Sequence, residues 1–144
     1  MRYPAFLDKW LNKINGLENK PNMSHEYSSQ ILENFYHPKN AGRFDDPANV
    51  IIGTAGTKEN GEVVELQIKV ENNVIKEAKF LEYGGVVVIA IMSWITDWLK
   101  GKTAAQALAI TDKDIVDALN VPKIKKHAIL LAIEAVKMVV NRTI

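Results

Sequence analysis

The stretch VVELQIKVENNVIKEAKFL, residues 63–81, decides the fold. Residues 63–70 are expected to form a strand, because apolar side chains alternate with polar ones from Val64 to Val70, the period of two that is typical of a half-buried strand. Asn72-Asn73 comes next, and because asparagine tolerates a positive φ, this dipeptide predicts a tight hairpin turn into a second strand, residues 74–81. Together with a strand expected at residues 50–54, the stretch predicts an antiparallel sheet of three strands.

Helical patterns lie on both sides of this sheet in the sequence. A short helix is expected over residues 28–36, and it ends at His37-Pro38 because the residue before a proline is pushed out of the helical region. After Gly84-Gly85 a longer helix begins, and it stops before Gly101. The remaining helices are expected at residues 104–109, 112–119 and 124–140, with Thr103 and Thr111 as N-caps of the first two. Strands followed by helices predict an α+β fold, with the helices packed on one face of the sheet.

An additional amphipathic pattern precedes the main domain. Residues 4–18 place apolar side chains at helical spacing, with polar ones opposite. The large apolar residues of this face are Phe6, Leu7, Trp10, Leu11 and Ile14. A polar linker containing Pro21 follows. We therefore divide the chain into an N-terminal helix with its linker, residues 1–22, and a main domain, residues 23–144.

Composition excludes several classes of function. With 18 Lys and Arg against 17 Asp and Glu, the formal charge of +1 provides no field for nucleic acid or an anionic membrane. No apolar run reaches the roughly 18 to 20 residues that a membrane span needs, and a secretion signal is not recognisable, so we expect a cytoplasmic protein. The chain has no cysteine, which excludes disulfides, persulfides, a cysteine nucleophile and sulfur ligands to a metal.

An ordered series of motifs resembles the scaffold proteins for iron–sulfur cluster assembly of the IscU, SufU and NifU N-terminal type. The series comprises Tyr27-Ser28, FYHPKNAGRFD at residues 35–45, LQIKV at residues 66–70, residues 75–84, TDWLKGK at residues 96–102, and residues 122–127. It covers residues 27–140 in the family order with almost no gaps. The resemblance implies the α+β fold predicted above and a site for cluster assembly.

The cluster site implied by this resemblance has lost its thiols. Such scaffolds use three cysteines, an aspartate and a histidine, because soft thiolates hold the cluster and a cysteine receives sulfur as persulfide. The corresponding positions are Asn60, Gly85 and Ala128 for the cysteines, Glu62 for the aspartate and His127 for the histidine. We therefore expect no cluster on this chain alone and no resident cofactor.

His127 and Glu62 are the only candidate metal ligands among these positions. Neutral imidazole and carboxylate both bind zinc or iron, but two protein ligands rarely hold either ion. A histidine that makes local hydrogen bonds is the preferred interpretation, and weak binding of zinc or iron is the alternative.

Two segments are candidate contact surfaces. The chaperone-recognition motif LPPVK of the family reads Val121, Pro122, Lys123, Ile124 and Lys125 here. With Lys126 it forms a basic cluster that fits either an acidic partner or a solvated helix start.

The second segment is the apolar run that replaces the family's serine-rich stretch, with Val86, Val87, Val88, Ile89, Ile91 and Met92. This run predicts either a core helix or an exposed patch or pocket, and an exposed patch marks an interface. In the latter case residues 4–18 are the expected cover, within one chain or across a homodimer.

We interpret the chain as a cysteine-free, scaffold-like protein that binds protein partners, such as a cysteine desulfurase or an enzyme system that has recruited the fold. One alternative is an enzyme or ligand-binding domain that uses an apolar pocket with Glu62 as acid or base beside His127. Another is a retained assembly role in which a partner supplies the thiols.

Overall fold

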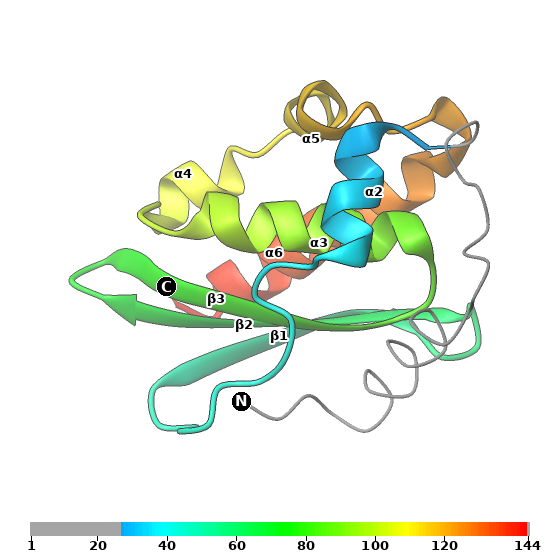
Figure 1. The fold of residues 1–144 in the computed structure, drawn as a ribbon. Coiled ribbons are helices and arrows are strands. Elements are labelled where there is room, and N and C mark those ends of the chain that lie inside the picture. The colour runs from blue at the N-terminus through cyan, green and yellow to red at the C-terminus, as the bar shows by residue number, and fades with distance from the viewer. Residues whose placement is uncertain (1–26, 144) are drawn as a thin grey trace.

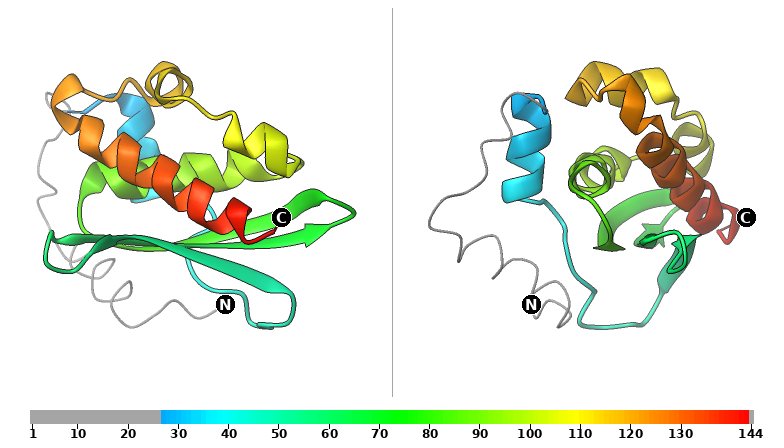
Figure 2. Two further views of the ribbon diagram at one scale, coloured as in Figure 1. Left: turned by 180° about the vertical axis from the view of Figure 1, so that it is seen from behind. Right: turned by 90° about the vertical axis from the view of Figure 1, so that its right-hand side faces the viewer.

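The structure, a computed structural model, describes residues 27–143. It has two layers, an antiparallel sheet below and a layer of helices above (Figure 1). The strands are β1 (Val50–Thr57), β2 (Glu62–Glu71) and β3 (Val74–Tyr83), and they lie in the order β1-β2-β3. The described helices all lie on one face of this sheet (Figures 1 and 2). The predicted α+β fold with a three-stranded antiparallel sheet is confirmed.

The hairpin between β2 and β3 forms where the sequence predicts it. Asn72 and Asn73 have φ angles of 53° and 63°, the left-handed conformation that a two-residue turn requires. The register pairs Leu66 with Phe80 and Val63 with Tyr83. Both strands run further than the apolar alternation indicates, because backbone pairing continues to their ends. This extension brings the end of β3 beside the start of β2.

The helices also lie close to their predicted positions. They are α2 (Ser29–Tyr36), α3 (Val86–Leu99), α4 (Ala104–Leu108), α5 (Asp112–Leu119), the 3-10 helix η1 (Lys123–Lys125) and α6 (Lys126–Asn141). Thr103 and Thr111 are N-caps, as expected, and each forms a reciprocal capping box with the residue three positions on. No helix within residues 27–143 is long and apolar enough to cross a membrane.

The core lies between the sheet and the two long helices, α3 and α6 (Figure 2). Leu66, Ile68 and Phe80 point into it from the sheet and are at most 1% exposed. Helix α6 approaches β1 so closely that a Cβ added at Gly53 would come within 2.6 Å of the Val139 backbone nitrogen. A residue without a side chain therefore allows the helix to rest on the strand.

The apolar run that begins α3 belongs to this core. Val87 to Met92 are between 0% and 4% exposed, and they share one hydrophobic cluster with residues of the sheet, α2 and α6. The hypothesis that this run forms an exposed patch or an apolar pocket is therefore wrong, and the core-helix interpretation is correct. The proposed cover, residues 4–18 with Trp10, lies outside the described residues.

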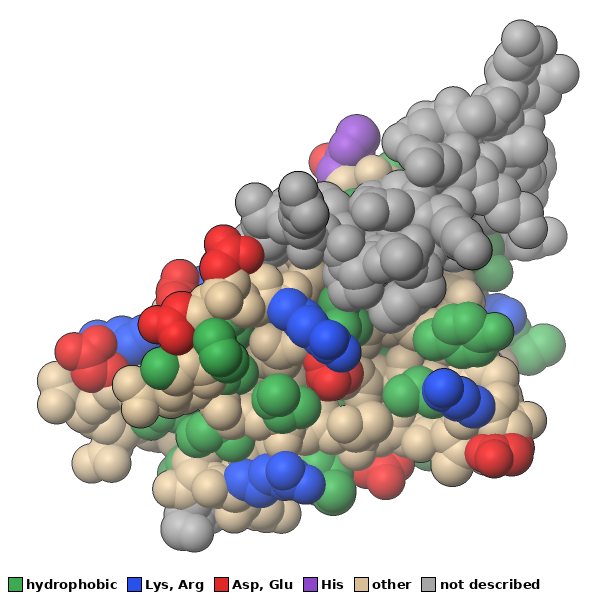
Figure 3. All heavy atoms as spheres, turned by 90° about the horizontal axis from the view of Figure 1, so that it is seen from below, with side chains coloured by type: hydrophobic (Ala, Val, Ile, Leu, Met, Phe, Trp, Pro, Cys, Tyr) green, Lys and Arg blue, Asp and Glu red, His purple; other side chains and the backbone are tan. Residues whose placement is uncertain are grey.

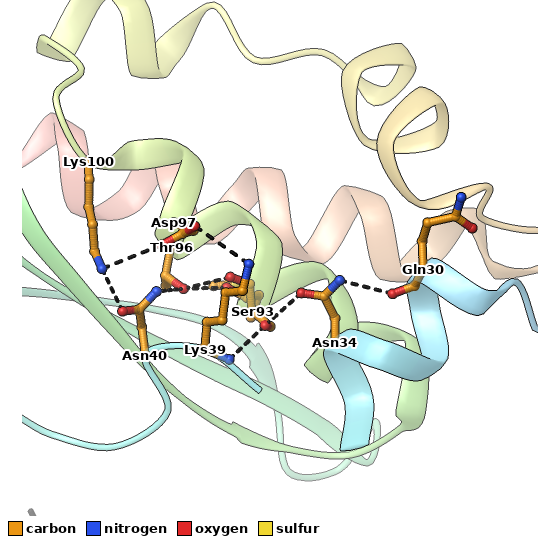
Figure 4. A network of polar contacts seen from close by, with 9 residues as sticks. Gln30, Asn34, Lys39, Asn40, Ser93, Thr96, Asp97 and Lys100 are labelled. Carbon is orange, nitrogen blue, oxygen red and sulfur yellow. Dashed lines mark hydrogen bonds and ion pairs between the residues drawn. The ribbon is translucent and has the colours of Figure 1, made fainter. Parts of the chain in front are cut away.

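A polar network fixes the loop after α2 onto α3 (Figure 4). Ser93 accepts a hydrogen bond from the Lys39 backbone N–H at 2.8 Å and donates one to Asn34 at 2.8 Å. Asn40 donates to Thr96 at 3.1 Å and accepts from the Lys100 ammonium group at 2.7 Å. These contacts account for buried polar side chains on an otherwise apolar helix.

The same loop also holds β3. The Phe80 backbone N–H donates to the Asn40 carbonyl at 3.0 Å, and the Gly42 N–H donates to the Phe80 carbonyl at 2.9 Å. The loop in the FYHPKNAGRFD motif thus forms hydrogen bonds to both β3 and α3 and holds the end of β3 against α3.

Candidate functional site

A cavity of about 600 Å³ lies at one end of the molecule. The turn between β1 and β2, the end of β3 and the start of α6 meet there, on the right in Figure 1. Its lining comprises Asn60, Gly61, Glu62, Glu82, Tyr83, Gly84, Gly85 and His127. We refer to it as the end cavity.

The end cavity brings together four of the five positions that the scaffold resemblance implies. Asn60, Glu62, Gly85 and His127 line it, although they are up to 67 residues apart in sequence. Ala128 follows His127 but is 1% exposed and packs in the hydrophobic core. Asn60 and Gly61 belong to a tight turn in which the Gly61 N–H donates to the Lys58 carbonyl at 3.0 Å.

His127 and Glu62 are close but loosely paired. The His127 Nε2 atom lies 3.7 Å from a Glu62 carboxylate oxygen, which is longer than a hydrogen bond. The His127 side chain is 59% exposed and that of Glu62 is 23% exposed. The contact is therefore an ion pair when His127 is protonated, and solvent screens it. Within residues 27–143, no three His, Cys, Asp or Glu side chains form a group that could hold a metal ion.

Glu82 is a site residue that the sequence analysis does not identify. It pairs with Val64 across the sheet and points, like Phe80 two residues before it, to the helix-covered face. It is 3% exposed, and neither carboxyl oxygen has a hydrogen-bond partner. Burial, and secondly the nearby Glu62 carboxylate, raise the pKa of Glu82 from 4.5 to about 9. Glu82 is thus protonated at neutral pH.

The end cavity is lined mainly by polar residues and glycines, unlike the apolar pocket that the sequence left open. Its walls are carboxyl, amide and imidazole groups and glycine backbone, with Tyr83 as the only large ring. None of the apolar residues 86–92 lines it. An enzyme or ligand site built on an apolar pocket with Glu62 and His127 is therefore not what the structure presents.

The segment Val121 to Lys125 is split between core and surface. Val121 is 6% exposed and Pro122 is half-buried, whereas Ile124 is 83% exposed. Lys123 is exposed and Lys125 is half-buried. None of these residues lines the end cavity.

The face of the sheet opposite the helices is mixed in character. Figure 3 shows hydrophobic side chains there interspersed with basic and acidic ones. Phe44 lies on this side, with the Lys69 ammonium group 4.7 Å from its ring centroid. The described residues that Figure 3 shows on this face therefore carry charges of both signs.

The sheet with helices on one face, and a cavity that joins positions 60, 62, 85 and 127, agree with the scaffold class that the sequence motifs resemble. The chain belongs to the family described as NifU-like N terminal domain, whose model matches residues 26–142. The resemblance inferred from the motifs is confirmed.

Individual relatives agree with this family. The chain is 41% identical over 116 residues to "Iron sulfur cluster assembly protein 1" of Trachipleistophora hominis, a match that covers 80% of this chain and 84% of that protein. It is 40% identical over 113 residues to "Iron-sulfur cluster assembly scaffold protein IscU" of Haemophilus influenzae, covering 77% and 90%.

A solved structure shows the same fold. The crystal structure of a putative iron-sulfur cluster assembly scaffold protein for the SUF system, from Fervidobacterium islandicum, superposes with a TM-score of 0.62. The match covers 79% of this chain and 96% of that one at 17% identity, so it supports the fold alone.

Proposed function

We propose that this protein acts in iron–sulfur cluster assembly as a partner-binding accessory protein that does not assemble a cluster on its own. The observation that carries the proposal is that Asn60, Gly85 and Ala128 occupy the positions where the scaffold resemblance implies cysteines. An amide, a hydrogen atom and a methyl group neither ligate iron as thiolates do nor accept sulfur as persulfide. The remaining role for the fold is recognition, and we propose that it takes place in the cytoplasm.

The proposed partner is a cysteine desulfurase, the protein that delivers sulfur in cluster assembly. Two features support a protein partner. Identity of about 40% to cluster assembly proteins extends over more than three-quarters of the chain. In addition, Ile124 is 83% exposed and lies next to Lys123. An exposed apolar side chain beside a cation fits an interface with an apolar centre and a charged rim.

Anaerobic reconstitution with iron, sulfide and a cysteine desulfurase tests whether the chain holds a cluster. We expect no stoichiometric cluster in the absorption and Mössbauer spectra of the isolated chain. The matched control is the triple variant Asn60→Cys, Gly85→Cys and Ala128→Cys, which restores the thiols. A Cβ at Gly85 meets only a Glu62 oxygen at 3.5 Å, an ordinary contact, so a side chain at position 85 fits.

Two results would contradict the proposal. A stoichiometric cluster on the isolated natural chain would show that the fold retains assembly without thiols of its own. A cluster found only in the complex with the desulfurase would instead support the alternative in which the partner supplies thiols.

Partner binding is tested separately by calorimetric titration of the chain with the purified desulfurase. If Ile124 is an anchor of the interface, Ile124→Ser should weaken binding at least about tenfold, as expected for an interface hot spot. Met138→Ser is the matched control, since Met138 is also an exposed apolar side chain, 40% exposed, but lies in α6, 14 residues after Ile124 in the sequence. If the two variants lost the same amount of affinity for the desulfurase, the segment 121–125 would not be part of the interface.

A further inference from the structure

Glu82 is a buried acid that the proposed function leaves without a role. It is 3% exposed and lines the end cavity, and both of its carboxyl oxygens lack a hydrogen-bond partner. Buried polar groups in folded proteins almost always have a hydrogen-bond partner, because a group removed from water without a new partner loses its hydrogen bonds to water. An unpaired acid at the wall of a cavity is therefore able to receive a hydrogen bond from a group bound in that cavity.

The charges around Glu82 are unfavourable in the free protein. Its nearest charged neighbour of consequence is the Glu62 carboxylate, and together with burial this like charge disfavours ionisation of Glu82. Two of the nearby basic side chains already have an acidic partner. His127 pairs loosely with Glu62 at 3.7 Å, and Arg43 pairs with Glu65 at 3.3 Å. A positive group placed between Glu62 and Glu82 would favour the ionised form of Glu82, which burial and the Glu62 carboxylate otherwise disfavour.

The Glu62 side chain is 23% exposed at the wall of the end cavity, and both Glu82 oxygens are buried directly behind that wall. A Cβ at Gly84 would lie 2.5 Å from a Glu82 oxygen and 2.7 Å from the Glu62 Cγ atom. Gly84 therefore lies in contact with both acids and contributes no side chain that would block them. Gly85, which also lies next to Glu62, likewise has no side chain that would cover the Glu62 carboxylate. The resulting volume of about 600 Å³ holds a planar polar group easily.

We propose that the end cavity binds a guanidinium group, with Glu82 and Glu62 as its acceptors. A guanidinium ion is planar and presents five N–H donors in a fork that matches a carboxylate with two parallel hydrogen bonds. It supplies both the charge and the donors that the two acids lack. A metal ion fits less well, because no group of three metal-ligating side chains exists among residues 27–143.

This recognition is independent of whether the chain holds a cluster. The guanidinium group is carried either by an arginine side chain of a partner protein or by a small free molecule, and both present the same chemistry to Glu82. If the desulfurase experiments failed, the proposal that the end cavity binds a guanidinium group would not be affected. If guanidinium binding failed, the proposed role in cluster assembly would not be affected.

The test is a titration with methylguanidinium, followed through the backbone amide NMR signals of the full chain. Methylurea is the matched probe, since it has a similar planar shape but no charge. We expect methylguanidinium to shift the Gly84 and Gly85 amide signals to saturation, and methylurea to leave them in place. The carboxyl carbon of Glu82 should titrate at lower pH when methylguanidinium is bound, because the cation favours the ionised acid.

Variants assign the binding to these residues. Glu82→Gln keeps the shape but cannot ionise when the cation binds, and it should weaken methylguanidinium binding at least about tenfold, the loss expected for charge-assisted hydrogen bonds. Glu62→Gln should weaken it in the same direction, and it provides a second measurement if the first variant fails to fold. Glu59→Gln is the matched control, because Glu59 is an exposed acid in the adjacent turn and does not line the cavity.

A comparison of one peptide with methylguanidinium distinguishes the sources of the guanidinium group. A blocked Gly-Arg-Gly peptide that binds more tightly than methylguanidinium would indicate a partner's arginine, and equal affinity would indicate a small free molecule. The proposal would be overturned if methylurea and methylguanidinium gave the same shifts. It would also be overturned if Glu82→Gln left the affinity unchanged, or if Zn²⁺ bound stoichiometrically between Glu62 and Glu82 and excluded the cation.

Discussion

Glu82 ties the stability of this protein to pH. In the folded state the pKa of Glu82 is raised to about 9 by burial and by Glu62, whereas in the unfolded chain it lies near 4.5. Between these two values the folded protein keeps a proton that the unfolded chain has released. Stability contributed by this group is therefore present at low pH, and it is lost as the pH rises from about 4.5 towards 9.

The first prediction follows from this sign. In the natural protein, ionisation of Glu82 should lower the free energy of unfolding by on the order of 1.4 kcal/mol per pH unit between about pH 4.5 and 9. Glu82→Gln should lack this pH dependence, because glutamine does not titrate. Urea unfolding of both proteins at several pH values measures the difference between their slopes. Glu59→Gln makes the same chemical substitution at an exposed position, so its slope should match that of the natural protein. Parallel curves for the natural protein and Glu82→Gln would mean that Glu82 is already ionised in the folded state.

The burial of Glu82 is hard to predict from the sequence for a physical reason. The alternation of inward and outward side chains along residues 74–81 continues through Glu82, since Ala78, Phe80 and Glu82 share one face. A carboxylate at the end of a strand is normally solvated, so composition alone predicts a strand end at Leu81. If the alternation of β3 is continued from Phe80 by one more period of two residues, it places the Glu82 side chain on the face of the sheet that packs against the core.

At the scale of elements, the contact between α6 and β1 depends on one glycine. A Cβ at Gly53 would meet the Val139 backbone nitrogen at 2.6 Å and its Cα at 2.9 Å. These are backbone atoms of a helix that packs across the sheet, so they move only if α6 moves. The strand and the helix therefore have no room for any side chain at position 53.

The second prediction is that Gly53→Ala lowers the free energy of unfolding by about 1–3 kcal/mol, the usual effect of overpacking a core. Gly85→Ala is the matched control, since its Cβ would meet only a Glu62 oxygen at 3.5 Å, and it should change stability by less than about 1 kcal/mol. Chemical unfolding of both variants checks the contrast. If Gly53→Ala were as stable as the natural chain, α6 would have to be able to shift away from β1.

Helix α3 shows what periodicity resolves and what it leaves open. The N-caps Thr103 and Thr111, the Asn72-Asn73 turn and the stop before Gly101 are local signals, and the structure confirms them. The apolar run of α3 has no polar side to orient it, so the sequence does not distinguish an exposed patch from a helix covered on most sides. The sheet, α2 and α6 bury it, and these contacts are long-range.

At the scale of the whole molecule, the end cavity predicts the metal content of the purified protein. His127 and Glu62 are too few to complete a four-coordinate zinc site, and no group of three metal ligands exists within residues 27–143. We expect much less than one zinc or iron ion per chain by elemental analysis after mild purification. One tightly bound ion per chain, lost in His127→Ala, would show that this histidine is a ligand.

The last prediction concerns the boundary between residues 1–22 and the main domain. The hydrophobic cluster is built from residues between Tyr27 and Val140, with both layers of the fold represented, and it includes the α3 run that the N-terminal helix was expected to cover. A domain of this length with a continuous core is large enough to fold independently. Deletion of residues 1–22 should therefore change the free energy of unfolding by less than about 1 kcal/mol, the range of changes made away from the core. Chemical unfolding and binding of a hydrophobic dye measure this. Strong dye binding and aggregation of the truncated chain would show that residues 1–22 protect an apolar surface of the main domain, which would then need those residues to stay soluble.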